Sequence, residues 1–196
     1  MKYSIDELSN QKTLNRKNFI FFWGHQASKD GKITQSCFSQ WWPCRFDFQG
    51  RSYFCSEQWM MAEKARLFND DKTRRKIYEL NDPELIKRAG REICNFNQKI
   101  WDLNKYQIVL YGNYLKFSQN EDLAEYLLAT NEKVIVEANP YDRIWGIGLT
   151  CNQKNIENPK NWIGQNLLGF ILMEIRDILR SNEELLPAPY TQCITS

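Results

Sequence analysis

Apolar side chains recur at helical spacing through most of this chain, and this periodicity limits the fold more than any other feature. The strongest example is the stretch NWIGQNLLGFILMEIRDILRS, where apolar residues occupy positions 167, 168, 171, 172, 175 and 179. Residues three and four apart share one face of a helix. The same spacing predicts further helices over 56–68, 70–82, 83–93, 98–119 and 120–130, of which the 98–119 helix is expected to be partly interrupted.

Only three short segments have the composition of strands. The aromatic run FIFFW at 19–23 and the β-branched run KVIVEANP at 133–140 are two of them. Phe46, Phe48 and Tyr53 alternate around Gln49-Gly50 and predict a short hairpin. The sequence therefore predicts a mainly α (α+β) fold. We expect a flexible N-terminal segment over 1–18, one domain over 19–182 and a C-terminal tail over 183–196.

Charge and cysteine content exclude several classes of protein. The net charge of +2, from 26 basic and 24 acidic residues, is too balanced for coating DNA or a membrane by bulk electrostatics, although a local basic groove remains compatible with it. The single histidine and the six cysteines, none in CxxC spacing, predict no metal site and no cofactor. A polar N-terminus and the lack of a long apolar run predict no signal peptide and no membrane span, hence free thiols and a cytoplasmic location, or a nuclear one in a eukaryote.

The stretch SEQWMMAEKARLF places two charges on an apolar helix face. Glu57, Met61, Lys64 and Phe68 are spaced four, three and four apart, with Ser56 as the expected N-cap. Glu57 either complements the helix dipole at the surface or serves chemistry, and Lys64 is either a surface lysine or its partner. A charge on an inward face is costly unless it is paired or used. Periodicity alone leaves both interpretations open.

Two other stretches carry candidate residues. NPYDRIWGIGL combines Asp142, Arg143 and Trp145 with two glycines, which permit tight turns or close approach to a ligand. WDLNKYQIVLYGNYLKFSQN offers Trp101 and Asn113, where a tryptophan is either a core residue or a surface for stacking on a base. Neither stretch alone decides between structure and function.

Taken in order, these stretches resemble the NADAR, or YbiA-like, family. The matching pieces are FFW, FSQWWP, SEQWMMAEKARLF, WDLNKYQIVLYGNYLKFSQN, LLAT, DRIWGIGL and NWIGQNLLGFILMEIRD, which together cover about residues 19–180. The resemblance implies a compact orthogonal helical domain with small β elements. It also implies hydrolysis of N-glycosidic bonds, either in phosphoribosylamino-pyrimidine intermediates of riboflavin synthesis or between ADP-ribose and guanine in DNA or RNA.

The resemblance also implies a set of site residues. It implies catalytic roles for Glu57, Lys64 and Asp142, and substrate-binding roles for Phe22, Trp23, Trp101, Asn113, Arg143, Trp145, Gly146 and Gly148. The chain departs from the family pattern in a longer loop over 24–36 and in a Trp where a Tyr often follows SEQ. The longer loop puts substrate access in question.

A mechanism follows from these residues as a hypothesis. A fixed carboxylate near C1 of the ribose stabilises the oxocarbenium-like transition state more than the ground state, and Glu57 is the candidate. Lys64 either donates a proton to the departing amine or forms a Schiff base with the opened ribose. Three functions compete: a glycosidase for ADP-ribosylated guanine, a glycosidase for a small phosphoribosyl-amine, and a non-catalytic nucleotide-binding module.

Overall fold

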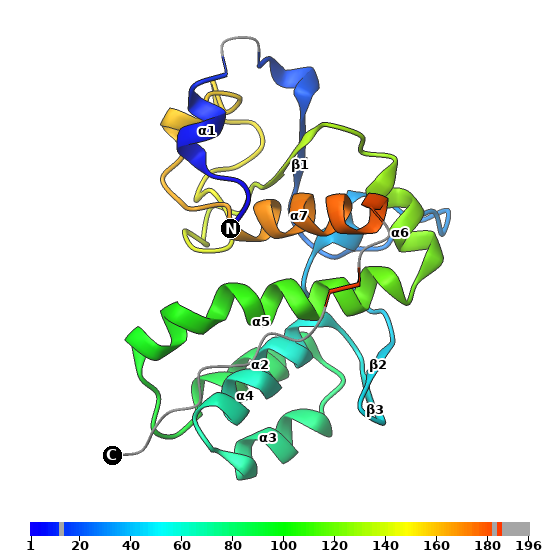
Figure 1. Ribbon diagram of the computed structural model, residues 1–196, viewed down its shortest axis with the longest axis vertical. Coiled ribbons are helices and arrows are strands. Elements are labelled where there is room, and N and C mark those ends of the chain that lie inside the picture. The colour runs from blue at the N-terminus through cyan, green and yellow to red at the C-terminus, as the bar shows by residue number, and fades with distance from the viewer. Residues whose placement is uncertain (12–13, 182–183, 186–196) are drawn as a thin grey trace. The chain divides into compact units, whose positions relative to one another are not determined.

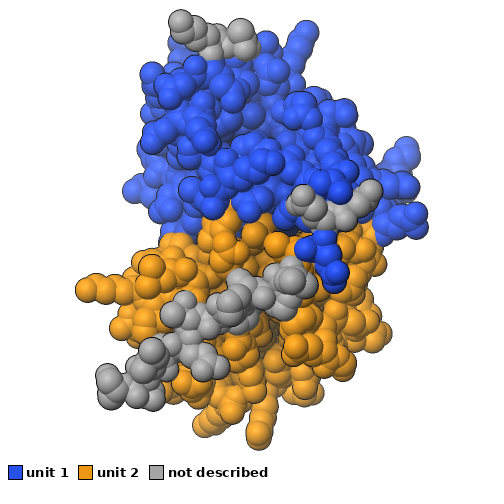
Figure 2. Space-filling view, viewed as in Figure 1, with its two compact units in different colours: residues 1–39, 121–184 blue, residues 40–120, 185–196 orange. Residues whose placement is uncertain are grey.

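A computed structural model describes residues 1–11, 14–181 and 184–185 of the chain. The tail expected over 183–196 therefore lies outside the described residues, apart from Glu184 and Leu185. The chain forms two compact units (Figure 2). Among the described residues, unit 1 contains those within 1–39 and 121–184, and unit 2 contains residues 40–120 and Leu185. The domain boundaries expected from the sequence stay predictions.

Unit 2 is built around one buried helix. Helix α2, Ser56–Leu67, packs against α3, Asp71–Tyr78, against α4, Pro83–Arg91, and against α5, Gln98–Ser118 (Figure 1). Ten of the twelve residues of α2 are buried, so the helix is covered on nearly every side rather than along one stripe. A helix in this position can hold a polar side chain away from water.

Local sequence signals explain where the helices of unit 2 begin. The side chains of Asp70, Asp82 and Asn97 cap α3, α4 and α5 by accepting hydrogen bonds from first-turn amides. Pro83 occupies the first turn of α4, as expected, where its missing N–H is harmless. The expected N-cap of α2 was wrong: Cys55 takes that position without a side-chain hydrogen bond, and Ser56 is inside the helix.

Two other helix predictions in unit 2 need correction. Helix α3 ends at Tyr78 rather than near residue 82. Helix α5 runs without a break from Gln98 to Ser118, although a partial interruption was expected. Gly112, inside this helix, permits close packing, because a Cβ there would lie 2.2 Å from Cδ1 of the buried Trp59. The indole Nε1 of Trp59 also donates to the carbonyl of Ile108, at 2.8 Å, so α2 and α5 meet tightly here.

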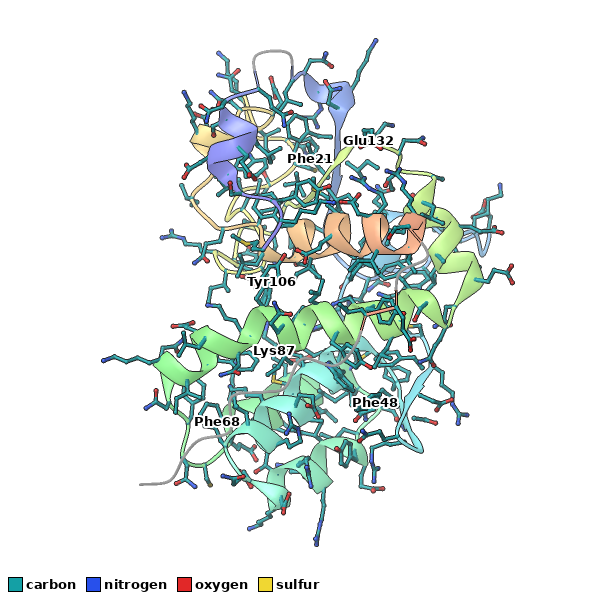
Figure 3. The ribbon with its side chains drawn as sticks, in the orientation of Figure 1. Phe21, Phe48, Phe68, Lys87, Tyr106 and Glu132 are labelled. Carbon is teal, nitrogen blue, oxygen red and sulfur yellow. The ribbon has the colours of Figure 1, made fainter. Side chains whose placement is uncertain are left out.

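The predicted hairpin is confirmed. Strands β2, Phe46–Phe48, and β3, Arg51–Tyr53, pair antiparallel with Phe46 opposite Tyr53. Gln49 and Gly50 both have positive φ, which is the geometry of a two-residue hairpin turn. Phe48, labelled in Figure 3, contacts Trp59 edge to face, with ring centroids 5.3 Å apart, so the hairpin packs on α2.

Unit 1 holds the remaining strands in a parallel pair. Strand β1, Phe19–Phe22, pairs with β4, Val134–Glu137, and Phe19 lies opposite Val134. Helix α7, Leu167–Ser181, packs on β4 and on α6, Glu121–Leu128. Three short 3-10 helices also belong to this unit: Arg16–Asn18, Gln35–Phe38 and Pro159–Asn161. The expected strands are therefore confirmed, and α7 begins at Leu167, six residues after the start of the quoted helical stretch.

The N-terminal residues, expected to be flexible, are attached to unit 1. Helix α1, Ile5–Ser9, buries Leu8. The Tyr3 hydroxyl donates to the carboxylate of Asp177 on α7 at 2.5 Å, and Lys2 forms an ion pair with the same carboxylate at 2.7 Å. These contacts tie both ends of unit 1 together.

The described residues form seven α-helices and four short strands, which confirms the mainly helical α+β prediction. Within the same residues, no helix is both long and apolar enough to cross a membrane.

Candidate active site

Helix α2 carries a buried carboxylate and a half-buried amine. Glu57 lies in the first turn of this helix, and only 3% of its surface is exposed. Lys64 follows seven residues later, about 10 Å along the helix axis. Met61 and Phe68, on the same face, are buried too. The surface interpretation of Glu57 is therefore wrong, because a dipole-complementing surface residue would be exposed.

The amine of Lys64 sits among two aromatic rings and a carbonyl. Its Nζ donates a hydrogen bond to the carbonyl of Gly90 at 3.0 Å. It also lies 4.4 Å from the ring centre of Phe96 and 5.7 Å from that of Trp101. Gly90 is in the last turn of α4, where carbonyl groups favour a positive charge. These contacts hold the amine in a defined place.

The surroundings of Lys64 shift its protonation equilibrium. Burial lowers the pKa of Lys64 from its usual value, the negative charge of Glu57 opposes that shift, and the positive charge of Arg91 adds to it. A lysine with a lowered pKa has a larger neutral fraction near pH 7, and the neutral amine is the nucleophilic form. The arrangement therefore suits either proton donation or covalent chemistry.

Asn113 belongs to the framework around the first turn of α2. Asn113 is fully buried, and its Nδ2 donates to Oε1 of Gln40 at 2.8 Å and to the carbonyl of Val109 at 2.9 Å. Ser56 donates from its hydroxyl to Oδ1 of Asn113 at 3.4 Å, and the carbonyl of Gln40 accepts the backbone N–H of Glu57 at 2.9 Å. Asn113 thus helps to position Glu57, and its contact with substrate stays a prediction.

The Asp142 loop of unit 1 is held by its own side chain. Oδ1 of Asp142 accepts the backbone N–H groups of Ile144 and Trp145, both at 2.8 Å. Carbonyl groups of this loop accept the N–H groups that begin α7: Ile144 accepts from Leu167 and Trp145 from Leu168. The loop therefore satisfies first-turn donors of α7, a structural task that the sequence motif did not suggest.

The two loop glycines are required by close packing. A Cβ at Gly146 would lie 2.7 Å from the backbone oxygen of Glu137. Gly148 has φ of +69°, and a Cβ there would lie 2.7 Å from the side chain of Ile163. Both glycines are explained by the fold alone, so their predicted contact with substrate stays a prediction.

The aromatic candidates of unit 1 differ in exposure. Phe22 is buried and meets Phe38 edge to face, with ring centroids 5.6 Å apart. Trp23 is 55% exposed, and its ring lies 6.2 Å from that of Tyr141. Trp145 is half-buried and Arg143 is exposed. Of these residues, Trp23 and Arg143 offer the most side-chain surface to a ligand.

The structure thus divides the predicted site residues between the two units. In unit 2, Lys64 lies beside the ring of Trp101, and the charge of Glu57 acts on the Lys64 amine. Asn113 belongs to the same unit. The other candidates belong to unit 1: Phe22, Trp23, Asp142, Arg143, Trp145, Gly146 and Gly148. Among the described residues, no group of three or more His, Cys, Asp or Glu side chains is placed to hold a metal ion.

Sequence reasoning missed three residues that shape these regions. Phe96 and Gly90 form the surroundings of Lys64, but both lie outside its helix and follow no recognisable pattern. Asn166 is fully buried, with Oδ1 accepting from the backbone N–H of Glu137 at 3.0 Å and Nδ2 donating to the carbonyl of Ile135 at 3.0 Å. Its polar side chain just before the apolar run of α7 was the only signal available.

Comparison with known proteins identifies the family. The NADAR domain model matches residues 21–180. "N-glycosidase R617" of Acanthamoeba polyphaga mimivirus is 47% identical over 165 residues, which cover 81% of this chain and 95% of that protein. "N-glycosidase YbiA" of Escherichia coli K12 is 32% identical over 138 residues, covering 70% of this chain and 76% of that protein.

The solved structures agree with the sequence comparison. The NMR structure of E. coli YbiA superposes with a TM-score of 0.68 at 25% sequence identity, covering 92% of this chain and 97% of that one. The family model spans most of the chain, and the resemblance stated from sequence motifs is confirmed. The chain therefore belongs to the NADAR family, the family of these N-glycosidases.

Proposed function

We propose that this chain hydrolyses the N-glycosidic bond between a ribosyl group and the amino group of a nucleobase, with Glu57 and Lys64 as its catalytic pair. The observation that carries the proposal is the surroundings of Lys64: a half-buried amine held by a carbonyl and two rings, two helical turns from a buried carboxylate. Membership of the NADAR family supports the same reaction.

Glu57 stabilises the positive charge that develops at C1 of the ribose. A carboxylate whose position is fixed before the reaction needs no reorganisation in the transition state. The first-turn position supports this role, because the helix N-terminus favours the ionised form. The hydrogen bond from the Glu57 amide to Gln40 fixes the backbone that carries the carboxylate.

Lys64 acts as the nucleophile in the version of the mechanism that its lowered pKa favours. The neutral Nζ attacks C1, the bond from C1 to the base nitrogen breaks, and the base leaves with a proton. The resulting ribosyl-lysine opens to a Schiff base, and water then releases the free sugar and restores the amine. In the alternative version, Lys64 only donates the proton to the leaving amine.

ADP-ribosylated guanine, in a nucleotide or in DNA or RNA, is the first candidate substrate, as the family resemblance implies. The second candidate, a phosphoribosylamino-pyrimidine of riboflavin synthesis, is favoured by the nearly balanced charge of +2, which suits a small ligand better than a polyanion. In either case Trp101, whose ring lies beside Lys64, is the candidate stacking surface. The substrate contacts expected for Trp23, Asp142, Arg143 and Trp145, which belong to unit 1, stay predictions.

The experiment incubates the protein with an ADP-ribosylated guanine oligonucleotide and, separately, with the riboflavin intermediates, and identifies the released base and sugar by mass. Borohydride is added to parallel reactions to reduce any Schiff base. Covalent attachment of the sugar to Lys64, absent in Lys64→Arg, supports the nucleophilic version. Release without trapping supports proton donation, and binding without any release favours the nucleotide-binding module and refutes the proposal.

A further inference from the structure

One face of α4 presents two cations, and the last turn of the same helix contacts the amine of Lys64. Lys87 and Arg91 are spaced four apart, so they share one face of α4, and Gly90 follows Lys87 by three residues. The carbonyl of Gly90 accepts the hydrogen bond from Lys64 at 3.0 Å. Both Lys87, labelled in Figure 3, and Arg91 are exposed. The last turn of α4, which carries Arg91, therefore lies at the proposed catalytic amine, and Lys87 is one helical turn further away.

Neither cation is neutralised by the described part of the chain. No described carboxylate forms an ion pair with Lys87 or Arg91. Two cations of α3 behave differently: Lys76 binds Glu92 at 2.5 Å, and Arg74 binds Asp71 at 2.7 Å. Lys87 and Arg91 therefore leave positive charge without an ion-pair partner on this face of α4.

The positive charges on this face act on one another. Arg91 lies close enough to Lys64 that its charge contributes to lowering the pKa of the lysine. Like charges held near one another destabilise the unliganded protein, and a bound anion removes that cost. Lys87 in turn lies 5.5 Å from the ring centre of Trp41, so this face combines cations with an aromatic surface.

We propose that Lys87 and Arg91 form a phosphate-binding subsite, which holds the phosphoryl group on the 5′ side of the substrate's ribose while C1 lies at Lys64. The inference rests on the proposed function and names the part of the substrate that the site recognises. Both candidate substrates carry phosphate at this position, as a monoester in one and as a diphosphate in the other. A guanidinium group matches phosphate oxygens with two parallel hydrogen bonds, and the lysine adds a second positive charge.

The test measures binding without turnover. Ribose, ribose 5-phosphate and ADP-ribose are titrated into the wild-type protein and into Lys87→Gln and Arg91→Gln by calorimetry at low and high salt. Arg88→Gln is the matched control, because Arg88 is exposed on the same helix and its charge acts on Glu92 instead. The comparison of the two phosphorylated probes distinguishes a monoester site from a diphosphate site.

We consider the phosphorylated probe that the wild-type protein binds more tightly. Arg91→Gln should lower the affinity for this probe about tenfold or more, and Lys87→Gln should lower it several-fold. Ribose binding and the Arg88→Gln protein should change less than twofold, and added salt should reduce the difference between wild type and variant. Equal binding of the phosphorylated probes by wild type and Arg91→Gln would overturn the inference. So would an equal loss in Arg88→Gln, or a wild-type protein that binds neither phosphorylated probe.

Turnover separates this inference from the proposed function. If the wild-type protein cleaves a substrate, Arg91→Gln should raise KM with kcat changed far less, because the lost contact is made equally in ground and transition states. If the wild-type protein cleaves neither candidate substrate, the proposed function fails, and the binding measurements still decide the subsite.

Discussion

Replacing Gly112 by alanine should destabilise unit 2 at the crossing of α2 and α5. The added Cβ would lie 2.2 Å from Cδ1 of Trp59 and 2.7 Å from its Cγ and Nε1, far inside contact distance. The indole cannot move freely, because it is buried and its Nε1 donates to Ile108. Alanine gains about 1 kcal/mol in helix propensity. Overpacking costs about 1–3 kcal/mol, and weakening the indole hydrogen bond costs about 1 kcal/mol more.

The net expectation is a loss of about 1–3 kcal/mol in the free energy of unfolding. Urea denaturation followed by tryptophan fluorescence and circular dichroism measures it, with the slopes of both proteins compared. Gly90→Ala is the matched control on α4: its Cβ would meet the flexible side chain of Met61, with Sδ at 2.0 Å, so the loss there should be smaller. A Gly112→Ala protein as stable as wild type would refute this packing argument.

Three further predictions concern stability. Asp70→Ala should lower the free energy of unfolding by about 1–3 kcal/mol, because Asp70 accepts hydrogen bonds from the backbone N–H groups of Thr73 and Cys94, both at 2.9 Å. Those bonds lower the pKa of Asp70 from 3.8, so the stabilisation should disappear as pH falls below that value; a constant difference in urea titrations from pH 6 to pH 2 would contradict this. The pKa of Lys64 is lowered from 10.5, so the unfolded chain binds more protons as pH approaches 10.5, and wild type should gain stability relative to Lys64→Met over that range in pH-dependent denaturation. Asn166→Ala should lower the free energy of unfolding by about 3 kcal/mol, because the carbonyl of Ile135 and the N–H of Glu137 lose their side-chain partner. A loss below about 1 kcal/mol, measured by thermal unfolding, would refute that role.

Sequence patterns predicted the elements of this fold well, because each depends on local chemistry. The hairpin needed only alternating aromatics around Gln49-Gly50, and α4 needed only Pro83 after a capping residue. Boundaries that depend on tertiary contacts were missed. Ser56 looks like an N-cap, but its hydroxyl donates to Asn113 on another helix. The helix over 98–119 was expected to be interrupted, but it is continuous, and its Gly112 makes room for Trp59.

The candidate site shows the same division. Helical spacing placed Glu57 and Lys64 on one inward face, and the structure confirms the burial of Glu57. Spacing could not reveal what surrounds Lys64, since Gly90 and Phe96 come from the end of α4 and the segment after it. It also could not show that Oδ1 of Asp142 is used by backbone N–H groups of its own loop. Contacts between distant segments carry this information, and no local pattern records them.

The most direct test of the catalytic pair is the turnover of Glu57→Gln on whichever candidate substrate the wild-type protein cleaves. Glutamine keeps the size of the side chain and removes its negative charge, so circular dichroism and the unfolding midpoint should stay close to wild type. Removing a fixed charge that stabilises a transition state typically lowers kcat by about 100-fold or more. We predict a loss of at least that size; a kcat within a few-fold of wild type would contradict the role of Glu57 and the mechanism built on it.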